Sequence, residues 1–155
     1  NLNGNNSYTD EKTTVITTST NAYNGYVVRA YSTDELRSLQ HPTEKIDDFS
    51  AGSYTAPSGW SGYGFGYSSS DTSIQGAGKF PESGSCLGTG VAPCFAPFAG
   101  SDDSPGDIVA DHTSSISGSP IIDQEFTITY KVAAPSSQTA GPYSTTVVYT
   151  VTPQY

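Results

Sequence analysis

Residues 125 to 133 read Glu-Phe-Thr-Ile-Thr-Tyr-Lys-Val-Ala, and apolar side chains occupy every second position of this run. The alternation predicts an extended strand with Phe126, Ile128, Tyr130 and Val132 on one face and polar side chains on the other. A strand with one apolar and one polar face is typical of an antiparallel sheet that covers a core on one side only. This run therefore indicates an all-β protein.

Two further runs, residues 13 to 20 and residues 143 to 152, are dominated by threonine, valine and tyrosine, which favour strands. The second of them follows the alternating run after a turn of nine residues. We expect these two neighbours in sequence to pair as a long antiparallel hairpin, with Val147, Tyr149 and Val151 facing inward.

The dipeptide Asn24-Gly25 is the strongest short signal for a hairpin turn. It predicts that residues 26 to 31 return antiparallel to residues 13 to 20, with their alternate apolar side chains facing inward.

One short helix is expected after this pair of strands. Residues 32 to 35, Ser-Thr-Asp-Glu, match a capping box, and Leu36 and Leu39 follow at helical spacing. His41 and Pro42 would end the helix after about two turns.

Composition supports the all-β class and excludes others. The chain has 155 residues, a formal net charge of −9, 14% charged residues and no methionine, so residues that favour long helices are scarce. The acidic balance argues against nucleic acid, which needs clustered lysine and arginine, and against binding to an anionic membrane surface. No apolar run is long enough for membrane insertion. We predict an antiparallel β-sandwich with one short helix, forming a single domain over residues 13 to 155.

A long irregular stretch in the middle of the chain contains both cysteines. Cys86 and Cys94 are separated by seven residues that include two glycines and one proline. Because no third or fourth cysteine completes a zinc set, a disulfide that staples this stretch is favoured over two free thiols. The disulfide and the low charge together indicate an extracellular or cell-surface location.

The amino-terminal residues 1 to 12 are polar, and Leu2 and Tyr8 are their only apolar anchors. We expect an arm that leaves its own domain and contacts a neighbouring subunit through these two side chains. A disordered tail is the alternative. Asn5 begins an Asn-Asn-Ser triplet, which matches an N-glycosylation sequon.

Aromatic side chains are concentrated between residues 60 and 67. Trp60, Tyr63, Phe65 and Tyr67 could form a platform on which sugar rings stack, and Trp60 and Tyr63 are the candidate stacking residues. The alternative is that these aromatic rings fill the core, which a chain without methionine needs. We expect Trp60 to be partly exposed and the other three side chains to be mostly buried.

Carboxylates cluster at Asp102, Asp103, Asp107 and Asp111, and oxygen-rich loops suit Ca²⁺. Their spacing does not match an EF-hand loop, and a solvated acidic loop is the alternative. The sequence has neither a Gly-x-Ser-x-Gly elbow nor a Gly-rich phosphate loop. We therefore predict no catalytic residues and no cofactor apart from this calcium candidate.

Residues 138 to 152 place an Ala-Gly-Pro-Tyr turn before a threonine- and valine-rich strand, and residues 17 to 28 place an Asn-Gly-Tyr turn after a threonine-rich strand. Both segments resemble bacterial surface β-sandwich domains, a set that includes WxL-type wall domains and fimbrial and spore-coat-U-like subunits. The resemblance implies a non-catalytic surface or filament subunit. The chain departs from the WxL pattern, because Trp60 is followed by Ser61 and Gly62.

These observations predict an extracellular structural protein whose partners are copies of itself, assembled through β-strand contacts into a pilus-like filament or a surface layer. A carbohydrate-binding module that uses exposed aromatic side chains is the alternative, with glycans as its partners. A small secreted hydrolase is the least favoured of the three.

Overall fold

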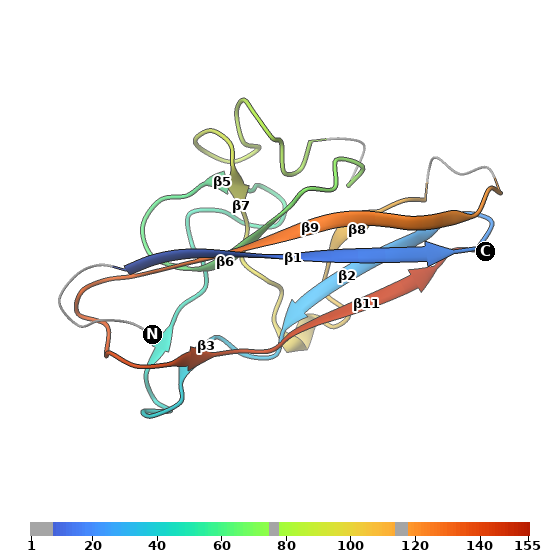
Figure 1. Ribbon diagram of the computed structural model, residues 1–155. Helices are drawn as coiled ribbons and strands as arrows, with labels where there is room; N and C mark the ends of the chain where they lie inside the picture. Colours follow the sequence, from blue (N-terminus) through green and yellow to red (C-terminus); the bar gives the residue numbers. More distant parts are fainter. Residues whose placement is uncertain (1–7, 75–77, 114–117) are drawn as a thin grey trace.

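The computed structural model describes residues 8–74, 78–113 and 118–155, and it is an all-β protein (Figure 1). One three-stranded antiparallel sheet contains β1 (Tyr8–Thr20), β9 (Ile121–Ala134) and β6 (Gly64–Ser69), in that order. A second contains β11 (Val147–Pro153), β2 (Tyr26–Ser32) and β8 (Asp107–Asp111), in that order. We call them the β1 sheet and the β11 sheet.

Two smaller sheets and one 3₁₀ turn complete the described part of the structure. A small sheet has the order β10 (Tyr143–Ser144), β3 (Leu36–Ser38) and β4 (Lys45–Ile46). β5 (Ser58–Gly59) pairs with β7 (Cys94–Phe95), and η1 (Ser101–Asp103) is a single 3₁₀ turn. No helix in the described part of the chain is long and apolar enough to cross a membrane.

Both larger sheets contribute to one hydrophobic core. Tyr26, Val28 and Ala30 of β2 are almost completely buried, as their alternation predicts. Phe126 and Ile128 of β9 belong to the same cluster. The sequence therefore predicts correctly which face of each of these strands is buried.

The turn at Asn24-Gly25 forms, but the expected hairpin does not. β1 pairs with β9, whereas β2 pairs with β11 and β8. Gly25 takes a φ of 78°, and the turn exchanges hydrogen bonds with the end of β11, from Asn24 N to Gln154 O and from Gln154 N to Gly25 O. The turn carries the chain from the β1 sheet to the β11 sheet. The predicted turn is therefore confirmed, but the predicted pairing of the strands on its two sides is wrong.

The hairpin expected between the last two long strands is also wrong. β9 lies between β1 and β6, and β11 pairs with β2. Between them the chain passes through β10, which pairs with β3 in the small sheet. Alternation fixes which face of a strand is buried, but it carries no information about which strand lies beside it. Val151 of β11, expected to face inward, is 45% exposed.

The short helix expected after residue 32 is replaced by β3. Ser32 cannot cap a helix because it ends β2, where its backbone N–H donates to Ala99 O at 2.9 Å. Leu36 pairs with Ile46 of β4, and Ser38 pairs with Tyr143 of β10. Pairing on both sides of β3 outweighs the local helical signal, which spans only two turns.

Residues 8 to 12, expected in the polar arm, are the first part of β1. They pair along residues 130 to 134 of β9 in the same chain. Tyr8 packs on Ile46 and Ala134, and its hydroxyl donates to Asp10 at 3.0 Å. Tyr8 is therefore anchored within its own domain, and the arm can include at most residues 1 to 7, which lie outside the described part.

Candidate functional site: an open groove between two sheet edges

A groove separates β1 from β11 and β10. Its widest part encloses about 480 Å³. The residues that line this part are Lys12, Thr14, Leu36, Phe65, Tyr130, Tyr143, Ser144, Thr145, Val147 and Tyr149. The floor is aromatic and aliphatic, whereas hydroxyl groups and one lysine lie along the rims. The two sheets therefore share a core but leave one margin of it uncovered.

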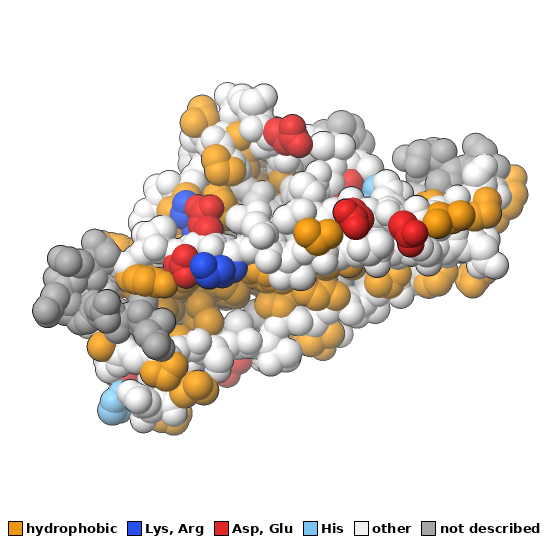
Figure 2. Space-filling model, viewed as in Figure 1, with side chains coloured by type: hydrophobic (Ala, Val, Ile, Leu, Met, Phe, Trp, Pro, Cys, Tyr) orange, Lys and Arg blue, Asp and Glu red, His pale blue; other side chains and the backbone are white. Residues whose placement is uncertain are grey.

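The groove continues along β1 toward its start. Two smaller cavities, of about 160 and 190 Å³, adjoin the widest part and share Leu36 with it. Val132 lies in both of them, and Tyr8 lines the last one. In Figure 2 hydrophobic side chains form a band beneath β1, between β1 and the β11 sheet. An extended segment about seven residues long would match the stretch of β1 from Tyr8 to Thr14.

The sequence of β1 explains why this margin is open. Alternate residues of β1 face the core, but three consecutive inward positions are polar: Asp10, Lys12 and Thr14. Lys12 and Thr14 are exposed although they lie on the inner face. Ile16, at the next inward position, packs on the core. The inner face of β1 is therefore polar from Asp10 to Thr14, along the groove.

Two strand edges flank the groove. Among the described residues β1 pairs only with β9, and β11 pairs only with β2. Each strand therefore presents alternate backbone N–H and C=O groups to solvent along its outer edge. In Figure 1 these two edges lie on the same side of the molecule. An extended chain laid between them could form main-chain hydrogen bonds and place apolar side chains on the floor.

Two tyrosine side chains join the sheets at the floor. The hydroxyl groups of Tyr130 on β9 and Tyr149 on β11 are 2.6 Å apart and form a hydrogen bond. Burial, and then the hydrogen bond with Tyr130, raise the pKa of Tyr149 above its ordinary value. The Tyr149 hydroxyl is therefore neutral at physiological pH, and its hydrogen bond joins the two sheets at the floor of the groove.

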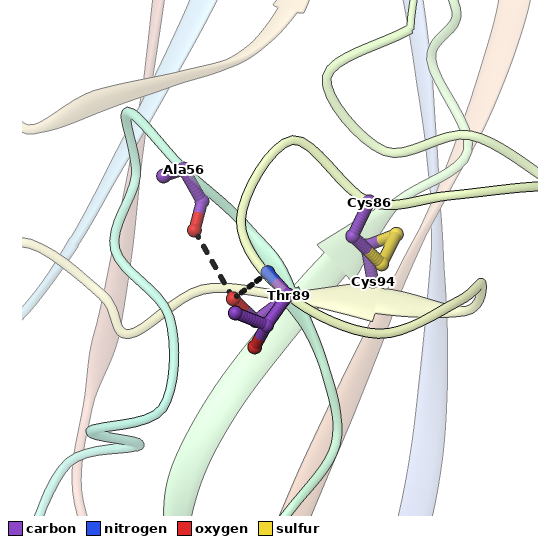
Figure 3. The surroundings of a disulfide bond; sticks show 5 residues. Ala56, Cys86, Thr89 and Cys94 are labelled. Carbon is purple, nitrogen blue, oxygen red and sulfur yellow. Dashed lines mark hydrogen bonds between the residues drawn. A yellow bond between two sulfur atoms is a disulfide. The ribbon is translucent and has the colours of Figure 1, made fainter.

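The disulfide expected from the sequence is confirmed. Cys86 and Cys94 are bonded, and the loop between them lies on β5 (Figure 3). Thr89 N donates to Ser58 Oγ at 3.0 Å, and Ser58 Oγ donates to Ala56 O. The disulfide thus closes a loop within the long irregular stretch, and hydrogen bonds hold this loop against β5.

The aromatic residues proposed for sugar stacking are separated. Trp60 is half-buried, as expected, and stacks on Phe49 with ring centroids 4.4 Å apart. Phe65 and Tyr67 are buried in the core, whereas Tyr63 is 52% exposed rather than buried. Because Phe49 covers one face of Trp60, these four aromatic side chains do not form a continuous open platform.

The four carboxylates proposed for calcium do not converge. Asp102 and Asp103 lie in η1, whereas Asp107 and Asp111 lie at opposite ends of β8, about 13 Å apart at strand spacing. The Asp111 carboxylate already accepts hydrogen bonds from the backbone N–H and the hydroxyl of Thr113. Within the described ranges no three histidine, cysteine or acidic side chains come close enough to hold a metal ion. Asn5 and Leu2 lie outside those ranges.

Comparison of the chain with protein-family models, curated proteins and solved structures found no match. The class that the structure itself defines is an all-β domain with one open groove. Sequence reasoning missed this groove. The signal that could have revealed it is the run of polar residues at inward positions of β1, of which Asp10 and Lys12 fall within the expected polar arm.

Proposed function

We propose that this chain is a non-catalytic structural domain of an extracellular surface. Copies of it assemble into a filament or a layer through contacts between β-strands. We further propose that the β1 and β11 sheets form a β-sandwich that is open at one margin.

The observation that carries this proposal is a pair of strand edges that have no partner strand among the described residues, beside a partly exposed apolar floor. A strand edge of 13 residues in β1 is an aggregation hazard unless another segment covers it. Covering the edge of β1 with an extended chain would satisfy its backbone groups and bury the floor in one step.

Other features support an extracellular setting. Cys86 and Cys94 form a disulfide, and disulfides persist in oxidising compartments such as the extracellular space. Serine and threonine outnumber charged residues in β1, seven to three. The resemblance of the two chain ends to bacterial surface domains agrees with this setting.

The test is the assembly state of the purified protein across a range of concentrations. We expect sedimentation velocity to show growing oligomers and electron microscopy to show a regular filament or sheet. Hydrogen exchange should slow in β1 and β11 on assembly, while the buried strand β2 should change little. A protein that stays monomeric at millimolar concentration, or that assembles without protection of β1 and β11, would refute the proposal.

We also propose that residues 1 to 7 contact a neighbouring copy, with Leu2 as the apolar anchor. Deletion of these seven residues leaves β1 intact, because β1 begins at Tyr8. We expect the shortened protein to keep its thermal unfolding temperature but to assemble at least tenfold more weakly. Unchanged assembly would show that this segment is only a tail.

A further inference from the structure

Asp48 is half-buried near the end of the groove that Ile46 lines, and one of its carboxylate oxygens is enclosed. Asp48 follows β4, and its Oδ1 atom is buried with no hydrogen-bond partner among the described residues. A buried acceptor without a partner is costly, and the cost is greatest when the group is charged. The enclosed position of Asp48 therefore favours its neutral form.

The groups that face Asp48 add to this preference. Asp47 precedes it, and Asp34 and Glu35 approach from the segment between β2 and β3. Asp102 and Asp103 of η1 line the same cavity of about 280 Å³. Burial first, and then the neighbouring carboxylates, raise the pKa of Asp48 to about 6.

The nearest cation does not balance these charges. Lys45 Nζ lies 2.7 Å from a carboxylate oxygen of Glu35 and 3.1 Å from one of Asp47. Arg37, the other cation of this region, pairs with Asp34. Lys45 does lower the pKa of Asp48 in part, but the burial and the carboxylates outweigh it.

The segment around Asp48 is attached to the floor of the groove. Phe65 N donates to Asp47 O at 3.0 Å, and Phe49 N donates to Phe65 O at 2.8 Å. The Phe65 side chain lies in the groove floor, and Ile46, two residues before Asp48, lines the end of the groove near Tyr8. These two hydrogen bonds therefore connect the segment around Asp48 to the residue that lines the groove floor.

We propose that Asp48 makes this segment sensitive to pH: residues 47 to 49 are held more firmly against β6 when Asp48 is protonated than when it is charged. The inference concerns regulation of the groove and rests on the proposed function, because firm walls favour the docking of a strand.

The direction follows from the linkage between protonation and folding. The pKa of Asp48 is higher in the folded protein than its ordinary value of 3.8, so the folded state binds this proton more tightly than the unfolded state. The stabilising effect of the proton is therefore complete below about pH 4, and it is lost as the pH rises through about 6. Above that range the contribution of Asp48 no longer changes.

The experiment measures unfolding by denaturant at pH 5.0 and pH 7.5, at concentrations where the protein is monomeric. It compares the natural protein, Asp48→Asn and Asp47→Asn. Asp47 is the matched control, because its carboxylate is 78% exposed and its removal changes the net charge equally. Hydrogen exchange of the Phe49 and Phe65 amides reports on the segment itself.

We expect the natural protein to show an about tenfold change in the folding equilibrium constant from Asp48 between the two pH values, and Asp48→Asn to remove it. Asp47→Asn should keep most of this change, because burial is the first cause of the raised pKa of Asp48 and Asp47 is a lesser one. In the natural protein, the Phe49 and Phe65 amides should be better protected at pH 5.0. Equal effects of the two variants, or an NMR titration that places the Asp48 carboxyl near its ordinary pKa, would overturn the inference. The NMR titration uses the natural protein, so it decides the matter even if Asp48→Asn does not fold. None of these measurements requires assembly, so failure of the proposed function would be seen separately.

Discussion

At the scale of single residues, the contact between Tyr130 and Tyr149 is the direct side-chain bond between the two sheets at the groove floor. Their hydroxyls are 2.6 Å apart, and both side chains are half-buried. Because the groove leaves the floor open, fewer side chains pack on these two tyrosines than in the rest of the core. The hydrogen bond between them therefore helps to hold the two sheets together there. It links β9 to β11 across the floor of the groove.

Replacement of Tyr149 by phenylalanine removes this bond and leaves the Tyr130 hydroxyl without its protein partner. We expect the free energy of unfolding to fall by about 1 kcal/mol. Tyr155→Phe is the control, because Tyr155 is 88% exposed and should change stability by less than about 0.5 kcal/mol. Chemical denaturation measures both variants, and equal losses would contradict the role given to the tyrosine pair.

The sequence is informative at this scale where alternation is regular. Tyr26, Val28 and Ile128 are buried as predicted, because the face of a strand depends only on local spacing. Asp10 and Lys12 were not recognised as inward-facing, since polar residues at inward positions look like a surface segment. Asp48 was unrecognised for another reason: its burial depends on β6, which is distant in sequence.

At the scale of elements, the disulfide loop and β5 form one packed unit. Gly88 N donates to Pro57 O at 2.9 Å, and Gly59 N donates to Thr89 O at 2.7 Å. A Cβ atom at Gly88 would lie 2.6 Å from Ala56 O and would overlap Ser58 Oγ. The loop therefore lies against β5 only because residue 88 has no side chain.

Gly88→Ala should push the loop away from β5. We expect a loss of about 1–3 kcal/mol in the free energy of unfolding, as for other overpacked sites. Gly100→Ala is the control, because a Cβ atom there meets nothing within 4 Å. Thermal unfolding under non-reducing conditions compares the two. If Gly100→Ala were as destabilising as Gly88→Ala, the close packing of the loop would not be the cause.

The sequence predicts the existence of strands better than their pairing. β1, β2, β9 and β11 all contain residues that the sequence places in strands, and the disulfide follows from cysteine spacing. Both expected hairpins are wrong, because each intervening turn carries the chain to another sheet. The helix expected near Leu36 fails for a related reason: β3 pairs with β10, which is far away in sequence, as well as with its neighbour β4.

At the scale of the whole molecule, the open margin is the feature that no single strand reveals. It arises because β1 and β11 are both edge strands and because they lie on the same side of the molecule. The net charge of −9 keeps copies apart, so assembly needs a specific contact that outweighs repulsion. The groove, with its apolar floor and two free edges, offers such a contact.

Two neighbouring threonines on β1 allow this claim to be tested with a matched pair of variants. Thr14 is exposed and lines the groove, whereas Thr13 is exposed on the opposite face of the strand. Thr14→Arg would fill the groove with a long side chain without removing any core residue. Thr13→Arg adds the same side chain and the same charge on the outer face.

The most direct test is sedimentation velocity of the natural protein, Thr14→Arg and Thr13→Arg, with thermal unfolding as a check on folding. We expect all three to unfold within a few degrees of one another. The natural protein and Thr13→Arg should assemble alike, and Thr14→Arg should assemble at least tenfold more weakly. If Thr14→Arg assembles as well as the natural protein, the groove is not the assembly site.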